Sequence, residues 1–79
     1  MSPTVFRDHG FRFHFFSREE ARMHVHVSCG DGEAKFWLEP DIELAKNAGL
    51  TRAQLKQIES IIEVRHADLC RAWKEHFNG

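Results

Sequence analysis

Residues 23–38 read M-H-V-H-V-S-C-G-D-G-E-A-K-F-W-L, two alternating apolar and polar runs around a glycine-rich centre. A period of two is typical of strands that bury one face of a sheet, and Asp31-Gly32 is typical of two-residue type I′ hairpin loops. With that loop the cross-strand pairs are Cys29 with Ala34, Val27 with Phe36 and Val25 with Leu38, and on the other face Ser28 with Lys35, His26 with Trp37 and His24 with Glu39. Because every apolar residue meets an apolar one, the stretch predicts an antiparallel hairpin in this register.

Further strands are predicted on both sides of this hairpin. Thr4 to Arg7 and the alternating run F-R-F-H-F-F at residues 11–16 are joined by the turn residues Asp8-His9-Gly10. After Pro40, residues 42–45 fit either another strand or the opening of a helical turn. We therefore expect a four- or five-stranded, mainly antiparallel meander over residues 1–48.

A long helix is predicted over residues 50–77. Thr51 and Gln54 have the spacing of a capping box, and Leu50 and Leu55 that of a hydrophobic staple. An apolar stripe follows at spacings of three, four and seven residues, formed by Leu55, Ile58, Ile62, Leu69, Ala72, Trp73 and Phe77. Arg65 falls on this stripe, and residues 51–77 in one helix would span roughly 40 Å, longer than so small a sheet. A kink or break near residue 65 is therefore expected, after which the last turns either overhang the sheet or fold back.

The 79 residues include 11 Lys and Arg, 12 Asp and Glu, and 42% hydrophobic residues. Such a chain predicts one small α+β domain, residues 1–79, too short for a large cofactor fold or a deep enclosed cavity. It has no apolar run long enough for a membrane span and its first residues lack a secretory pattern, so we expect a cytoplasmic protein. The widely separated Cys29 and Cys70 predict free thiols, and the net charge of -1 argues against bulk phosphate-backbone binding as the main activity.

Six histidines are unusual in so short a chain, and two of them share the polar face of the hairpin. With the helix on the apolar face, we expect the opposite face to present Arg12, His14, Phe16, His24, His26, Ser28, Lys35 and Trp37. His24 and His26 point the same way along one strand, and His14 could join them to hold a zinc ion with an open position for water. An ordinary structural or surface role for these histidines is the alternative to metal binding.

A third interpretation of the same face needs no metal. His24 and His26 could act as acid and base beside a neighbouring cation, as in enzymes that cleave RNA phosphodiesters. The face equally suits binding of single-stranded RNA without cleavage, because Phe16 and Trp37 can stack bases while cations meet phosphates. Spacing alone does not separate a ribonuclease from an RNA-binding protein.

Essentially the whole chain follows an ordered set of short motifs: M-S-P-T-V-F-R, G-F-R-F-H-F-F-S, M-H-V-H-V, G-D-G-E-A-K-F and a closing L-x-x-x-W-x-x-x-F. In this order they resemble the short bacterial proteins grouped as domain of unknown function 4160. Family members usually carry proline before the first histidine of the pair, where this chain has Ala21-Arg22-Met23. The resemblance implies a gene beside that of another small protein, as in toxin and antitoxin pairs, and it maps the family's histidine pair onto His24 and His26.

Two functions therefore stay open. The first is a protein-interaction or regulatory module of a two-protein, toxin-antitoxin-like operon, which binds a small partner protein encoded nearby. Its surface would be the sheet face or the helix end, where an overhanging stripe of Leu69, Trp73 and Phe77 would be exposed. The second is a small RNA-binding protein or ribonuclease that uses His24 and His26. A free sheet edge also leaves homodimerisation open, with the histidine face as interface.

Overall fold

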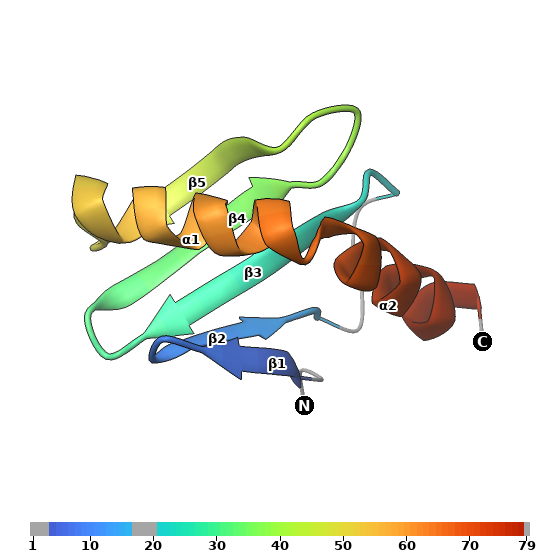
Figure 1. Ribbon diagram of the computed structural model, residues 1–79, viewed down its shortest axis with the longest axis horizontal. Coiled ribbons are helices and arrows are strands. Elements are labelled where there is room, and N and C mark those ends of the chain that lie inside the picture. The colour runs from blue at the N-terminus through green and yellow to red at the C-terminus, as the bar shows by residue number, and fades with distance from the viewer. Residues whose placement is uncertain (1–3, 17–20, 79) are drawn as a thin grey trace.

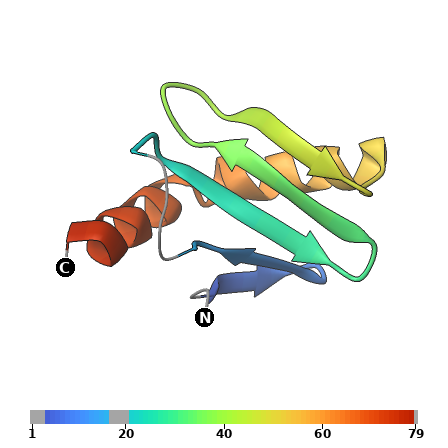
Figure 2. The same ribbon diagram turned by 180° about the vertical axis from the view of Figure 1, so that it is seen from behind.

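The computed structural model describes residues 4–16 and 21–78. Its elements are the strands β1 (Thr4–Asp8), β2 (Phe11–His14), β3 (His24–Cys29), β4 (Gly32–Trp37) and β5 (Glu43–Ala48), and the helices α1 (Arg52–Val64) and α2 (His66–Asn78). The strands form one antiparallel sheet in chain order, and both helices lie on the same side of it (Figure 1). Figure 2 shows the molecule from behind, where the sheet lies in front of the helices. The predicted α+β meander is confirmed, with five strands and two helices.

The hairpin of β3 and β4 has the two faces that were predicted, but the predicted register is wrong by two residues. The observed pairs are His24 with Trp37, Val25 with Phe36, His26 with Lys35, Val27 with Ala34, Ser28 with Glu33 and Cys29 with Gly32. A shift of two keeps every side chain on its face, so alternation alone does not distinguish the two registers. The contact of Gly32 with β5 distinguishes the observed register from the predicted one. A Cβ atom at Gly32 would lie 2.1 Å from the carbonyl oxygen of Ala48, so a strand position, and not the loop, needs this glycine.

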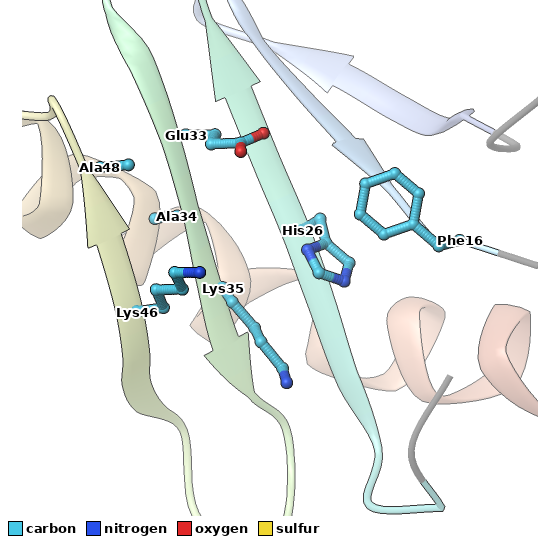
Figure 3. A pocket seen from close by; sticks show the side chains of 7 residues that line it. All are labelled: Phe16, His26, Glu33, Ala34, Lys35, Lys46 and Ala48. Carbon is cyan, nitrogen blue, oxygen red and sulfur yellow. The ribbon is translucent and has the colours of Figure 1, made fainter. Parts of the chain in front are cut away.

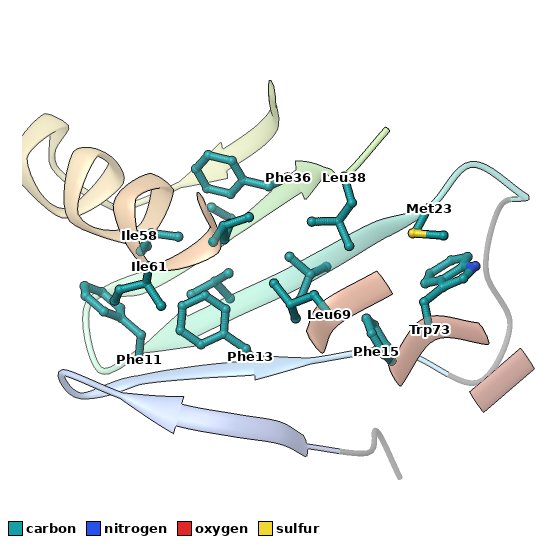
Figure 4. Packing of buried hydrophobic residues seen from close by; sticks show 14 of the residues in the cluster. Phe11, Phe13, Phe15, Met23, Phe36, Leu38, Ile58, Ile61, Leu69 and Trp73 are labelled. Carbon is teal, nitrogen blue, oxygen red and sulfur yellow. The ribbon is translucent and has the colours of Figure 1, made fainter. Parts of the chain in front are cut away.

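The core lies between the sheet and the helices (Figure 4). It is formed by alternating residues of the inner strands and by the apolar stripe of the helices. The members that are at most 4% exposed include Phe11, Phe13, Phe15, Val25, Val27, Phe36, Leu38, Ile58, Ile62 and Leu69. Because the helices cover this apolar face, the opposite face of the sheet is the one left for polar side chains.

The local signals at the helix start and at the first turn are confirmed. Thr51 caps α1 in a full capping box, in which the Gln54 N–H donates to Thr51 Oγ1 at 3.1 Å and the Thr51 N–H donates to Gln54 Oε1 at 2.9 Å. The Gln54 amide also donates to Asp31 Oδ2 at 2.9 Å, which fastens the β3–β4 loop to the helix start. In the β1–β2 turn, His9 and Gly10 both have positive φ, 50° and 81°, as a type I′ turn requires.

The helical segment breaks at Arg65, the C-cap residue that follows α1, within the region predicted for a break. The Arg65 guanidinium carbon lies 4.3 Å from the centre of the Phe6 ring, and Nε lies 3.7 Å from Asp8 Oδ2. The next residue, His66, donates from Nε2 to the carbonyl oxygen of Leu38 at 2.7 Å, because a carbonyl oxygen can only accept. Contacts to β1 and to Leu38, the residue after β4, therefore hold the break against the sheet and explain the cation on the apolar stripe.

The break bends the helical segment, so α2 leaves the direction of α1 and its C-terminal end lies beyond the ends of the strands (Figure 1). Leu69 is 0% exposed and Trp73 8%, and the Trp73 ring packs edge-on against Phe15 with 5.4 Å between ring centres. Phe77 is half-buried, with its ring centre 4.2 Å from that of Trp73. An overhanging stripe of Leu69, Trp73 and Phe77 would have been exposed, but Leu69 and Trp73 are buried in the core and Phe77 is half-buried. The longest extent of the molecule is 34 Å, shorter than an unbroken helix of this length would be.

β5 forms an outer edge of the sheet, and all six of its residues are exposed. It spans Glu43–Ala48, which is longer than the predicted strand at residues 42–45, and the helical alternative for those residues is wrong. A bulge between Lys35 and Phe36 shifts the pairing of β4 with β5. On the side of this bulge nearer the β3–β4 loop, Lys35 pairs directly with Lys46.

Candidate functional site

The face of the sheet that lacks helices carries a cross-strand row of basic side chains. His14 of β2 pairs with His26 of β3, His26 pairs with Lys35 of β4, and Lys35 pairs with Lys46 of β5. Directly paired residues of antiparallel strands point to the same face, so these four side chains lie side by side. We call them the basic row. With about 4.8 Å between neighbouring strands, the row is about 14 Å long.

The histidine end of the basic row is built around two rings at different depths. His14 is buried, and its ring centre lies 5.8 Å from that of His26 and 5.2 Å from that of Phe16. Phe16 is 40% exposed and packs edge-on against His26, with 4.3 Å between ring centres. The Ser28 hydroxyl lies 3.4 Å from His14 Nε2. His14 therefore supports His26 and Phe16 from below, and those two rings reach the surface.

The lysine end of the basic row places two like charges opposite each other, an arrangement that destabilises a sheet. The Lys35 ammonium lies 4.5 Å from the centre of the Trp37 ring, and the Arg22 guanidinium carbon lies 4.2 Å from the same centre. Cation–π attraction therefore orients Lys35 toward Trp37. With two cations against it, the Trp37 ring is already occupied by protein contacts.

Burial separates the two histidines of the H-x-H motif. His24 is 0% exposed, and its Nδ1–H donates to the carbonyl oxygen of Arg22 at 2.7 Å. Its ring centre lies 5.6 Å from that of Trp37 and 5.0 Å from that of Trp73. His24 thus joins the sheet to α2 as a packed core residue and does not reach solvent. Of the two histidines predicted as acid and base, His24 is therefore buried and His26 is the one that reaches the surface.

The three histidines proposed as zinc ligands lie near one another, but their geometry does not make a metal site. The ring centres of His24 and His26 are 5.1 Å apart, in an edge-to-face arrangement. Among residues 4–16 and 21–78, no group of three or more His, Cys, Asp or Glu side chains could hold a metal ion. Glu39, paired with His24 in the predicted register, accepts a hydrogen bond from the Met23 N–H at 3.1 Å.

A hollow of about 270 Å³ opens over the basic row (Figure 3). Its lining consists of Phe16, His26, Glu33, Ala34, Lys35, Lys46 and Ala48. Phe16 lies on one side of His26 in the close-up view, and the Glu33 carboxylate and the two lysines lie on the other. The hollow thus combines an aromatic ring, cationic groups and one carboxylate, a set that can bind a ring-bearing anion.

Sequence reasoning identified three residues of this lining, Phe16, His26 and Lys35, and missed Lys46 and Glu33. Both depend on strand pairing, because Lys46 enters through the β4–β5 bulge and Glu33 through the register of β3 and β4. The predicted cation Arg12 pairs with Ser28 in the neighbouring row, and its Nε donates to Thr4 Oγ1 at 2.7 Å. Arg12 therefore flanks the hollow and is absent from its lining.

A second pair of titratable side chains lies at the start of α2. Cys70 Sγ is 3.6 Å from His66 Nε2, and both cysteines of the chain are free thiols, as predicted. Burial is the largest effect and raises the pKa of the Cys70 thiol. To a smaller extent, Lys74 lowers this pKa and Glu39 raises it. Because a raised thiol pKa keeps the sulfur protonated, Cys70 is a packing residue and a poor nucleophile.

The fold and the site together define a small α+β protein whose sheet is covered by helices on one face and carries a basic, hollowed surface on the other. The family model described as "Domain of unknown function (DUF4160)" matches residues 10–74. The chain belongs to this family, as the resemblance in its motifs indicated. No curated protein and no solved structure matches the chain. Within the described residues, no helix is long and apolar enough to cross a membrane.

Proposed function

We propose that this protein binds single-stranded RNA on the sheet face opposite the helices. The observation that carries the proposal is the strand register, which aligns His26, Lys35 and Lys46 beside the exposed ring of Phe16. In this arrangement the lysines meet phosphates and Phe16 stacks a base, the two contacts that most single-stranded nucleic-acid sites combine.

Two features favour RNA over another polyanion. The lysines that pair across β4 and β5 place two positive charges in the same hollow as the Phe16 ring, where one bound phosphate can contact both. An acidic peptide would satisfy the lysines equally well, but it offers nothing flat to the exposed Phe16 ring. The small size of the hollow and the net charge of -1 favour recognition of a few nucleotides over coating of a long backbone.

The site supports binding in preference to cleavage. General acid-base cleavage of RNA uses two groups that both reach the reacting phosphate. His24 is buried and its Nδ1 proton is engaged by the Arg22 carbonyl, so only His26 of the H-x-H motif faces the hollow. A role for the His24 and His26 pair as acid and base is therefore not part of the proposal.

Fluorescence anisotropy with a labelled single-stranded RNA of about eight nucleotides tests the proposal. We expect Lys35→Ala/Lys46→Ala to weaken binding at least about tenfold and to lower the slope of log K against log salt by about 1.4, because two phosphate contacts are lost. Phe16→Ala should weaken binding by about 1–3 kcal/mol. The matched control is Lys56→Ala, which removes an exposed lysine from α1. Absence of binding, or equal loss in the double variant and the control, would overturn the proposal.

A protein-interaction module is the second candidate, and β5 is the observation that favours it. This edge strand exposes all six residues, including the apolar Leu44, so its outer backbone groups could pair with a strand of a partner. The helix end no longer serves this role, since Leu69 and Trp73 are buried. A small partner encoded nearby, in an operon of the toxin-antitoxin kind, would add a sixth strand here.

Co-expression with the product of the adjacent gene tests this candidate. A stable complex that is lost in Leu44→Glu but kept in Glu63→Lys, an exposed position on α1, would support strand addition at β5. A light-scattering mass equal to two copies of this chain would assign the edge to a homodimer instead. A monomer that does not bind the adjacent product would remove the candidate.

A further inference from the structure

The carboxylate of Glu33 is the part of the hollow that phosphate binding does not explain. Glu33 lines the same hollow as His26, Lys35 and Lys46, and a negative charge there weakens any phosphate contact. Within the described residues no ion pair within 4.0 Å holds the Glu33 carboxylate, although it lies in the same hollow as the two lysines. Its cross-strand partner is the uncharged Ser28.

We infer that Glu33 reads the base of the bound RNA and gives the hollow a preference for guanine. This inference rests on the proposed RNA binding and names the nucleotide that the site takes. A carboxylate has two acceptor oxygens and no donor when ionised. Guanine presents two adjacent donors, N1–H and the exocyclic N2 amine, on its Watson–Crick edge. Adenine, cytosine and uracil each place at most one donor beside an acceptor there, so one carboxylate oxygen would face a lone pair.

The spacing within the hollow fits one nucleotide. Glu33 and Lys35 lie two residues apart on the same face of β4, a separation of about 7 Å along the strand. A base that stacks on Phe16 can therefore turn its edge toward Glu33 while its phosphate reaches the lysines. In Figure 3 the Phe16 ring and the Glu33 carboxylate lie on either side of the His26 ring, with Lys35 extending past it. The basic row thus supplies affinity, and the neighbouring row supplies selectivity.

The test compares uridine hexamers that carry a single central guanosine, adenosine or cytidine with the all-uridine hexamer. We expect the guanosine oligomer to bind about five- to a hundredfold more tightly than the other three, the range for a good bidentate contact with a base edge. Glu33→Gln replaces one acceptor oxygen with a donor amide, so the preference should fall below about twofold while the all-uridine affinity stays equal or rises. Glu43→Gln on β5 makes the same charge change outside the lining of the hollow and should keep the preference.

The outcomes separate this inference from the function on which it rests. Equal binding of all four hexamers by the wild-type protein would overturn the guanine preference and leave RNA binding intact. Retention of a guanine preference in Glu33→Gln would also overturn it, because another group would then read the base. Failure of every hexamer to bind would overturn both. Thermal melts of the two variants within a degree or so of the wild type exclude misfolding as the cause, since both positions are exposed.

Discussion

Lys46→Glu should make the protein more stable while removing its RNA binding. Lys46 pairs directly with Lys35, so the substitution replaces two like charges by an opposite pair on the open face of the sheet. Cross-strand pairs contribute about 0.2–1 kcal/mol. The Lys35 ammonium already leans on Trp37 at 4.5 Å, and Glu33 lies in the same hollow, so a gain near the middle of that range, about 0.5 kcal/mol, is expected. For a domain of this size that gain raises Tm by about 2–4 °C.

Differential scanning calorimetry at low and high salt measures the gain. Because the pair is exposed to solvent, the stabilisation should shrink at 1 M salt, where the Debye length is only about 3 Å. Lys46→Gln removes the repulsion without adding an attraction and should raise Tm by about half as much. Lys56→Glu, at an exposed position of α1, controls for the change in net charge.

At low salt, Lys46→Glu could leave Tm unchanged or lower it, with the same change in Tm for the control Lys56→Glu. Such a result would mean that the two lysines do not repel each other across β4 and β5. If the stability rises but RNA affinity is unaffected, the opposed lysines would carry a cost without serving the proposed site. A rise in stability with a loss of binding is the expected signature of a side chain kept for function.

Three further outcomes follow from burial and contact. Leu69→Ala should lower the free energy of unfolding in urea by about 3–5 kcal/mol, because Leu69 is fully buried in the core. The exposed Arg71→Ala should cost under about 0.5 kcal/mol, and an equally small loss at Leu69 would contradict the packing of α2 on the core. Gly32→Ala should cost about 1–3 kcal/mol, because its Cβ would collide with the carbonyl oxygen of Ala48, and unchanged stability would contradict that close approach. Burial raises the pKa of Cys70, so the stabilising contribution of this thiol is fully present below its ordinary pKa of 9.0 and is lost as pH rises above that value. Cys70→Ala should therefore weaken the fall in stability at alkaline pH, measured by melting at a series of pH values.

Much of the fold could be predicted from local patterns. Alternation assigned Val25 and Val27 to the buried face and His26 to the opposite one, because successive side chains of a strand point to opposite sides. The capping box of Thr51 and Gln54 placed the helix start correctly, because its hydrogen bonds join residues only three apart. The break near residue 65 was anticipated from one cation on an apolar stripe and from the length of the helix.

The candidate site was less predictable, because it depends on contacts between distant segments. The approach of β5 to Gly32 selects a register two residues from the one that turn chemistry favours. That register places Lys35 beside His26, and the bulge in β4 and β5 then brings Lys46 into line. His24 was expected on the surface because its contact with Trp73 of α2 leaves no mark in the strand pattern.

The sequence by itself determined the class of fold, the two faces of the sheet and the start of the first helix. These follow from periods of two and from caps and turns, which involve residues near one another in the chain. Only the tertiary structure decided which strand residues are opposite neighbours, and hence that a row of His14, His26, Lys35 and Lys46 exists at all. The physical reason is that a shift of two residues preserves every hydrophobic contact pattern within a strand, so the register is chosen by packing against β5 and the helices.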